Sequence, residues 1–224
     1  MAKFVVDSSS LISLSSTCLV RLFGALSENE GLDFYIPESV YAESVERPLG
    51  IRRFELNAVR IRDAVDAGEL HIGKRTPEVA ALTSELERCG NCMSAKGMPM
   101  RLIQRGETEA LALGKVLGAK AIVIDERTTR MLAEDPYGLR KFLQARHSTK
   151  VSVDEALLSR FRGIASGFAF VRSSEIVALA YENDLFGSEL RHDRQALEAA
   201  LYAVKFGGCA VSTTEIESYL REVR

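Results

Sequence analysis

Two aspartates in this 224-residue sequence each follow a short apolar run, in positions where the carboxylates of a metal site are expected. Asp7 follows the run that begins at Phe4, and Asp125 follows the run that begins at Ala121. If both runs are parallel strands of one sheet, both carboxylates lie at the same edge of that sheet. Each aspartate also suits a helix N-cap. Crowded carboxylates repel one another unless a cation lies between them, and their oxygens favour Mg²⁺ or Mn²⁺.

Two glutamates could add to this pair. Glu109 heads the apolar stripe of a helix, where a carboxylate must be desolvated, paired or bound to a metal. The alternative for Glu109 is a favourable place in the first helical turn, but Glu107 can already fill that place. Glu43 lies about two turns into a helix that Pro37 opens. From the residues alone, Arg47 four positions later favours an ordinary surface ion pair for Glu43.

Short apolar runs alternate with helical patterns along the chain. The expected strands cover residues 4–6, 32–36, 69–72, 121–124 and 168–171. Helices are expected after Ser8 and Pro37, from near Thr128, and over 52–67, 77–88, 107–117 and 173–181. The remainder from about 191 is expected to be mostly helical, with a break at Gly207-Gly208. The glycines and polar residues of 89–99 indicate a loop. This alternation predicts an α/β fold with a parallel sheet covered by helices on both faces.

The composition excludes several classes of protein. Lys and Arg number 29 and Asp and Glu number 31, which gives a formal charge of −2. A basic protein that coats nucleic acid is therefore excluded, and a polyanion must be bound by a local patch. Four cysteines are too few for a disulfide scaffold, and no apolar stretch suits a signal peptide or a membrane span. These features predict a reduced, cytoplasmic protein with no membrane partner.

The four acidic positions lie in segments that resemble, in order, the four motifs of PIN-domain nucleases. The segments are Val5–Ile12, Ile36–Glu43, Gly106–Leu113 and Ile122–Arg127. The resemblance covers about residues 1–135 and extends less closely to 168–175. The stretch 52–105 and the region after Asp125 are longer than in the compact family pattern.

The resemblance implies a three-layer α/β/α sandwich with a mostly parallel central sheet, helical insertions and a helical C-terminal extension. It implies metal-dependent cleavage of RNA, and many members of the family are toxins of toxin–antitoxin pairs. Carried over by position, the catalytic and metal-binding residues would be Asp7, Glu43, Glu109 and Asp125, holding one or two Mg²⁺ or Mn²⁺ ions, with Ser9 as an auxiliary residue. Glu107 and Glu126 are the rivals for the third and fourth positions.

The same resemblance suggests an organisation and a set of partners. A PIN-like domain would span 1–184, with an insertion around 50–105 and added helices around 135–166, and a helical extension at 185–224 would pack on it. RNA is the expected partner, and Arg127 and Arg130 are the expected RNA-binding residues because they follow Asp125 directly. A protein antitoxin is a further candidate partner, and apolar helices such as 196–204 offer a surface for a homodimer.

A lone Cys-x-x-Cys pair, Cys89 and Cys92, falls in the expected loop. Structural zinc usually has four ligands, commonly from two such pairs. No spacing in the sequence supplies the second pair, so we do not expect a structural zinc site here.

Two other functions remain open from the sequence. The first is a PIN-like module that binds RNA or a protein without cutting. The second is a metal-dependent phosphatase of another α/β class, such as the haloacid-dehalogenase-like enzymes. That class needs a second aspartate two residues after the first, where this sequence has Ser9.

Overall fold

A five-stranded sheet forms the centre of the molecule in a computed structural model that describes residues 1–187 and 190–223. All four pairs of neighbouring strands are parallel. In spatial order the strands are β3 (His71–Gly73), β2 (Leu32–Pro37), β1 (Ala2–Val6), β6 (Ala121–Val123) and β8 (Ala169–Val171). The predicted parallel α/β fold is confirmed, and the five predicted strands are those of this sheet.

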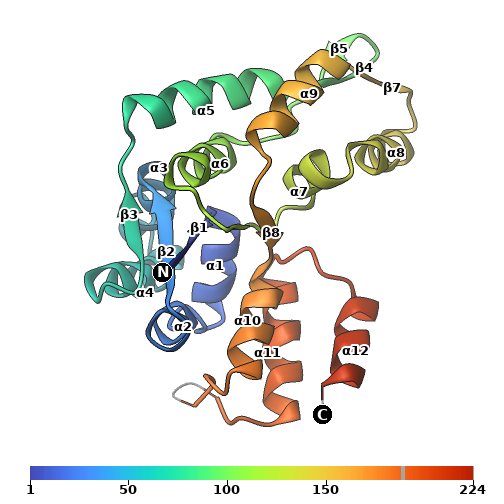
Figure 1. Cartoon of the computed structure of the whole chain (residues 1–224). Coiled ribbons are helices and arrows are strands. Elements are labelled where there is room, and N and C mark those ends of the chain that lie inside the picture. The colour runs from blue at the N-terminus through green and yellow to red at the C-terminus, as the bar shows by residue number, and fades with distance from the viewer. Residues whose placement is uncertain (188–189, 224) are drawn as a thin grey trace.

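Helices cover both faces of the sheet (Figure 1). Alternate residues of a strand face opposite sides, so Val6 joins one hydrophobic core and Val5 joins the other. The first core is built with α1 (Ser8–Ser16), α2 (Leu22–Glu30), α4 (Arg52–Asp66), α10 (Ser173–Glu182), α11 (Arg194–Gly207) and α12 (Thr213–Glu222). The second is built with α5 (Pro77–Cys89), α6 (Arg105–Leu117), α7 (Arg127–Glu134), α8 (Pro136–His147) and α9 (Glu155–Ile164). The three-layer sandwich follows from these two cores.

Capping residues set the helix boundaries. Helix α5 begins at Pro77, and the side chain of Thr76 accepts a hydrogen bond from the third residue of the helix. Helix α6 ends at Leu117 and is capped by Gly118, which has the left-handed φ of 62° that a glycine adopts without strain. At its other end α6 begins two residues before the predicted start, because Gln104 and Glu107 form a capping box.

The predicted loop over 89–99 is wrong in part. It contains β4 (Met93–Ala95) and β5 (Met98–Pro99), and β4 also pairs with β7 (Val151–Val153) in an antiparallel sheet. Lys96 and Gly97 between β4 and β5 both have positive φ, as in a tight hairpin turn. Figure 1 shows this second sheet beyond α8 and α9, far from the C-terminal helices. The glycines and polar residues of this stretch favour a loop, and the pairing of β4 with β7 joins residues that are far apart in the sequence.

The segment after β2 departs from a regular helix. Helix α3 (Glu38–Tyr41) passes into a π-helical turn, η1 (Ala42–Glu46), and then into a 3₁₀ turn, η2 (Pro48–Gly50). The sequence predicts the opening of this helix at Pro37 but not the change of winding.

The C-terminal helices are packed into the first core. Leu197, Leu201 and Val204 of α11 are buried there, and Gly208 ends the helix at the predicted break with a φ of 125°. The apolar face proposed for a homodimer is thus covered within the chain by α1 and α10. Among the described residues, the longest helix has 15 residues, and none is long and apolar enough to cross a bilayer.

Candidate functional site

The carboxyl ends of β1 and β6 lie side by side. The amide of Asp7, just after β1, donates a hydrogen bond of 2.9 Å to the carbonyl of Val123, the last residue of β6. Asp125 follows two residues later. In a parallel sheet this edge is where ligands usually bind.

Asp7 uses one carboxylate oxygen for structure and leaves the other without a partner. Its Oδ2 accepts hydrogen bonds from the amide of Ser9 at 3.1 Å and from the Ser9 hydroxyl at 2.8 Å, which caps α1. Its Oδ1 is buried and has no hydrogen-bond partner. Burial raises the pKa of Asp7, the hydrogen bonds from Ser9 oppose that rise, and the charge of Glu43 adds to it.

Glu43 approaches Asp7 at the first turn of α6. A Cβ atom on Gly106 would lie 3.4 Å from Oε2 of Glu43 and 3.7 Å from Oδ1 of Asp7. The missing side chain at Gly106 therefore leaves a space that two carboxylates face. Glu43 lies on the π-helical turn η1, a feature often found at functional sites. No ion pair joins Glu43 to Arg47 within the described residues.

Glu109 lies on the same face of α6 as Gly106, three residues further along the helix. Its side chain is 1% exposed, and neither carboxylate oxygen has a hydrogen-bond partner. Arg75 forms an ion pair with Glu109, with its Nε 3.9 Å from Oε2 of Glu109. A buried carboxylate with two open oxygens is costly unless a cation compensates it.

Glu107, the rival for the third position, has a structural role. Its Oε2 accepts hydrogen bonds from the amide of Gln104 at 2.6 Å and from the hydroxyl of Thr129 at 2.9 Å. Burial first, and the negative charge of Asp7 second, raise the pKa of Glu107 to about 7. Glu107 thus caps α6 and ties it to α7.

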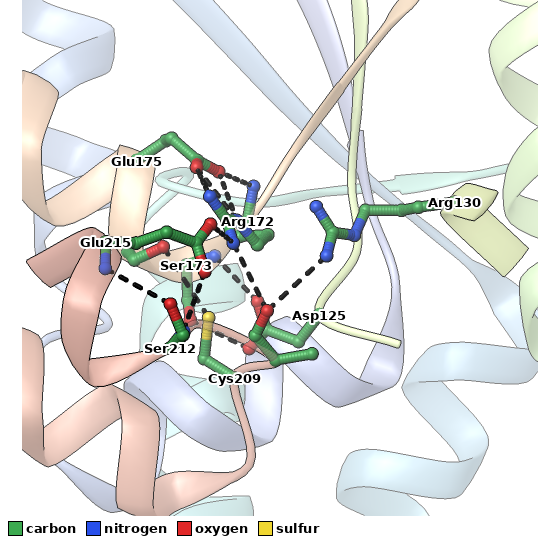
Figure 2. A network of polar contacts seen from close by, with 10 residues as sticks. Asp125, Arg130, Arg172, Ser173, Glu175, Cys209, Ser212 and Glu215 are labelled. Atoms are coloured by element: carbon green, nitrogen blue, oxygen red, sulfur yellow. Dashed lines mark hydrogen bonds and ion pairs between the residues drawn. The ribbon is translucent and has the colours of Figure 1, made fainter. Parts of the chain in front are cut away.

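The carboxylate of Asp125 is directed to the first turn of α10. Its Oδ1 accepts a hydrogen bond from the amide of Ser173, and its Oδ2 accepts one from the Ser173 hydroxyl, both at 2.7 Å (Figure 2). Its own amide donates to the hydroxyl of Ser9 at 3.2 Å, so Ser9 bridges Asp7 and Asp125. The sequence does not predict Ser173 as a site residue. Ser173 is the first residue of α10, two positions after the end of β8, just as Ser8 is the first residue of α1, two positions after the end of β1. The rival Glu126 accepts a hydrogen bond from the amide of Thr128 and caps α7.

Arginines hold the C-terminal segment beside Asp125 (Figure 2). Arg172 donates to the carbonyl of Ala210 at 3.2 Å and pairs with Glu175 and with Glu215 of α12. Arg130 donates to the same Ala210 carbonyl at 3.5 Å.

The two predicted RNA-binding arginines have different surroundings. Arg130 is half-buried, and its burial, followed by the charge of Arg172, lowers its pKa. Arg127 is exposed and lies over the ring of Phe142 with 5.7 Å to the ring centre. RNA binding by either arginine stays a prediction.

The cysteine pair lies in the second core. Cys89 ends α5 and Cys92 precedes β4, and both thiols are free and buried. Burial is the main cause that raises the pKa of Cys92, to about 11.

The residues around Gly106 fit a hard divalent cation, but the side chains of the four predicted ligands are not arranged as one metal-binding cluster. Within residues 1–187 and 190–223, no three Asp, Glu, His or Cys side chains are grouped closely enough to hold a metal ion. Mg²⁺ and Mn²⁺ prefer carboxylate oxygens such as those of Asp7 and Glu109 that accept no hydrogen bond and those of the nearby Glu43. Asp125 differs, because both of its oxygens already accept hydrogen bonds from Ser173.

Comparison with known proteins identifies the fold family. A family model described as a PIN domain matches residues 3–139, more than half of the chain. No curated protein and no solved structure matches the chain significantly. The chain therefore belongs to the PIN-domain family, whose members are generally nucleases.

Proposed function

We propose that this protein is a metal-dependent ribonuclease that hydrolyses phosphodiester bonds within RNA. One observation carries the proposal: buried carboxylate oxygens of Asp7 and Glu109 have no hydrogen-bond partner, and Glu43 faces the space left by Gly106. All these groups come from elements at the carboxyl edge of a PIN-domain sheet. Burying carboxylate oxygens without hydrogen bonds costs free energy, and such a cost is expected where a functional cation binds.

Each residue has a distinct part in the proposed site. Asp7, Glu43 and Glu109 would hold one or two Mg²⁺ or Mn²⁺ ions. Such an ion, when bound, supplies an activated water and stabilises negative charge on the phosphoryl oxygens. Ser9 orients Asp7 by donating to its Oδ2, which leaves Oδ1 directed to the space at Gly106. The backbone amide of Asp125 donates a hydrogen bond to the Ser9 hydroxyl, and Asp125 would in this way keep the ends of β1 and β6 in register.

The experiment is cleavage of a fluorescent single-stranded RNA in the presence of Mn²⁺. We expect the wild-type chain to cleave this RNA. Asp7→Asn should cleave it more slowly by about 100-fold or more, because one carboxylate ligand becomes a neutral amide. Asp66→Asn, which makes the same change at an exposed site at the end of α4, serves as the matched control and should retain the wild-type rate.

Two results would contradict the proposal. Equal cleavage by wild type and Asp7→Asn would show that the activity does not come from this site. Tight RNA binding by the wild type without cleavage in Mn²⁺ or Mg²⁺ would instead identify a binding module.

A further inference from the structure

Arg75 lies at the same edge of the sheet as the carboxylates, on a short and well-anchored connection. It stands two residues after β3, which runs parallel to its neighbour in the sheet, and one residue before Thr76, the N-cap of α5. A strand end and a capped helix therefore fix the backbone on both sides of Arg75. Because the strands are parallel, this connection is at the carboxyl edge, as Asp7 is.

The side chain of Arg75 lies beside Glu109 but makes no hydrogen bond to it. Its Nε lies 3.9 Å from Oε2 of Glu109, which is beyond hydrogen-bond distance. The Glu109 side chain is 1% exposed, whereas that of Arg75 is 39% exposed. In the part of the chain that the structure describes, this ion pair is the one polar contact of the Arg75 side chain. Its guanidinium therefore presents free N–H donors to solvent at the mouth of the site.

We propose that Arg75 binds a phosphate of the RNA next to the metal-binding carboxylates and so positions the substrate. This inference rests on the proposed function and adds a residue to it. The planar guanidinium can donate two parallel hydrogen bonds to a phosphate. At 3.9 Å the Glu109 carboxylate accepts neither of them, so both remain available.

The charge around the site gives the physical reason. Asp7, Glu43, Glu107 and Glu109 gather near the start of α6, and the whole chain carries a formal charge of −2. A polyanion approaching this edge needs a local positive group. A divalent cation held by Glu109 would also repel Arg75 from that carboxylate and favour its contact with a phosphate.

The test compares Arg75→Gln with Arg88→Gln. Arg88 lies in the last turn of α5, at the opposite end of the helix that Arg75 precedes, and is exposed. Binding of a short single-stranded RNA is measured in EDTA, where no metal-dependent cleavage occurs, over a range of KCl concentrations. Mn²⁺ binding without RNA is measured on the same proteins.

We expect Arg75→Gln to weaken RNA binding by about tenfold and to reduce the slope of log affinity against log salt by about 0.7, the value of one lost phosphate contact on a single strand. Arg75→Lys should recover part of the affinity, because lysine keeps the positive charge but cannot donate two parallel hydrogen bonds to one phosphate. Arg88→Gln should bind RNA as the wild type does. The Mn²⁺ affinity of Arg75→Gln should be unchanged or higher, since a cation near Glu109 has been removed.

The inference is overturned if Arg75→Gln gains Mn²⁺ affinity while its RNA affinity and salt slope equal those of the wild type. Arg75 would then be only a counter-ion for Glu109. The two proposals fail separately: a wild type that cleaves RNA with no effect of Arg75→Gln on binding refutes only the role of Arg75. A wild type that binds RNA through Arg75 but never cleaves it refutes only the nuclease.

Discussion

Asp7 shows how one side chain can serve the fold and the site together. A helix cap needs one acceptor oxygen, and Oδ2 of Asp7 supplies it through Ser9. The second oxygen stays open and faces the space at Gly106. The choice between cap and ligand that the sequence leaves open is therefore not exclusive, because the two oxygens have different surroundings.

Gly106 gives a prediction at the scale of one residue. In Gly106→Ala the new methyl group would lie 3.4 Å from Glu43 and 3.7 Å from Asp7, in the space assigned to the cation. We expect Mn²⁺ affinity, measured by calorimetry, to fall by about tenfold or more. Thermal stability should be equal or slightly higher, because alanine is favoured over glycine within a helix by about 1 kcal/mol.

The control for this substitution is Gly163→Ala in α9, where the added Cβ would have no neighbour within 4 Å. It carries the same gain in helix propensity and should leave Mn²⁺ affinity unchanged. Unaltered Mn²⁺ binding by Gly106→Ala would place the cation elsewhere.

At the scale of elements, the sequence predicts what depends on local order and misses what depends on long-range contact. The strand ends at Asp7 and Asp125 are readable from apolar runs, and the capping residues indicate where helices begin. The partner that Asp125 finds, Ser173, is 48 residues away. The pairing of β4 with β7 and the position of Arg75 beside Glu109 also arise only when the chain is folded.

The attachment of α12 gives a prediction for the dependence on pH. Burial alone would raise the pKa of Glu215, but hydrogen bonds from Ser212 and the charge of Arg172 outweigh it and lower this pKa to about 2. A lowered pKa in the folded state contributes stability above the ordinary value of 4.5, and that contribution is lost as the pH falls toward 2. Protonation of Glu215 should therefore loosen α12 in this range.

Hydrogen exchange of the α12 amides checks this prediction through the difference between wild type and Glu215→Gln. At pH 6 the wild type should be the better protected, and the difference should vanish near pH 2. A difference that stays constant across this range would show that the pair between Arg172 and Glu215 does not hold α12.

For the whole molecule, the family match ends well before the folded unit does. The match stops at residue 139, yet β8 belongs to the main sheet and α11 contributes Leu201 and Val204 to the first core. The hydroxyl of Ser13 in α1 also donates to the carbonyl of Val204 at 3.2 Å. The C-terminal helices are thus part of the core that supports Asp7 and α1.

A chain truncated after residue 184 should not fold stably. Each buried leucine or valine of α11 contributes about 1.5–3 kcal/mol, and a domain is stable by only about 5–15 kcal/mol in total. Circular dichroism during thermal unfolding should show no cooperative transition for the truncated chain and a clear one for the full chain. A truncated chain that unfolds cooperatively near the wild-type temperature would make residues 185–224 a separable extension.

The central claim is that carboxylates around Gly106 hold a divalent cation, and a calorimetric titration with Mn²⁺ tests it most directly. The wild type and the control Asp66→Asn should bind one or two Mn²⁺ ions. Asp7→Asn should lose this binding, because Oδ1 of Asp7 is one of the carboxylate oxygens available to the metal. Absence of Mn²⁺ binding by the wild type, or equal binding by Asp7→Asn, would contradict the account.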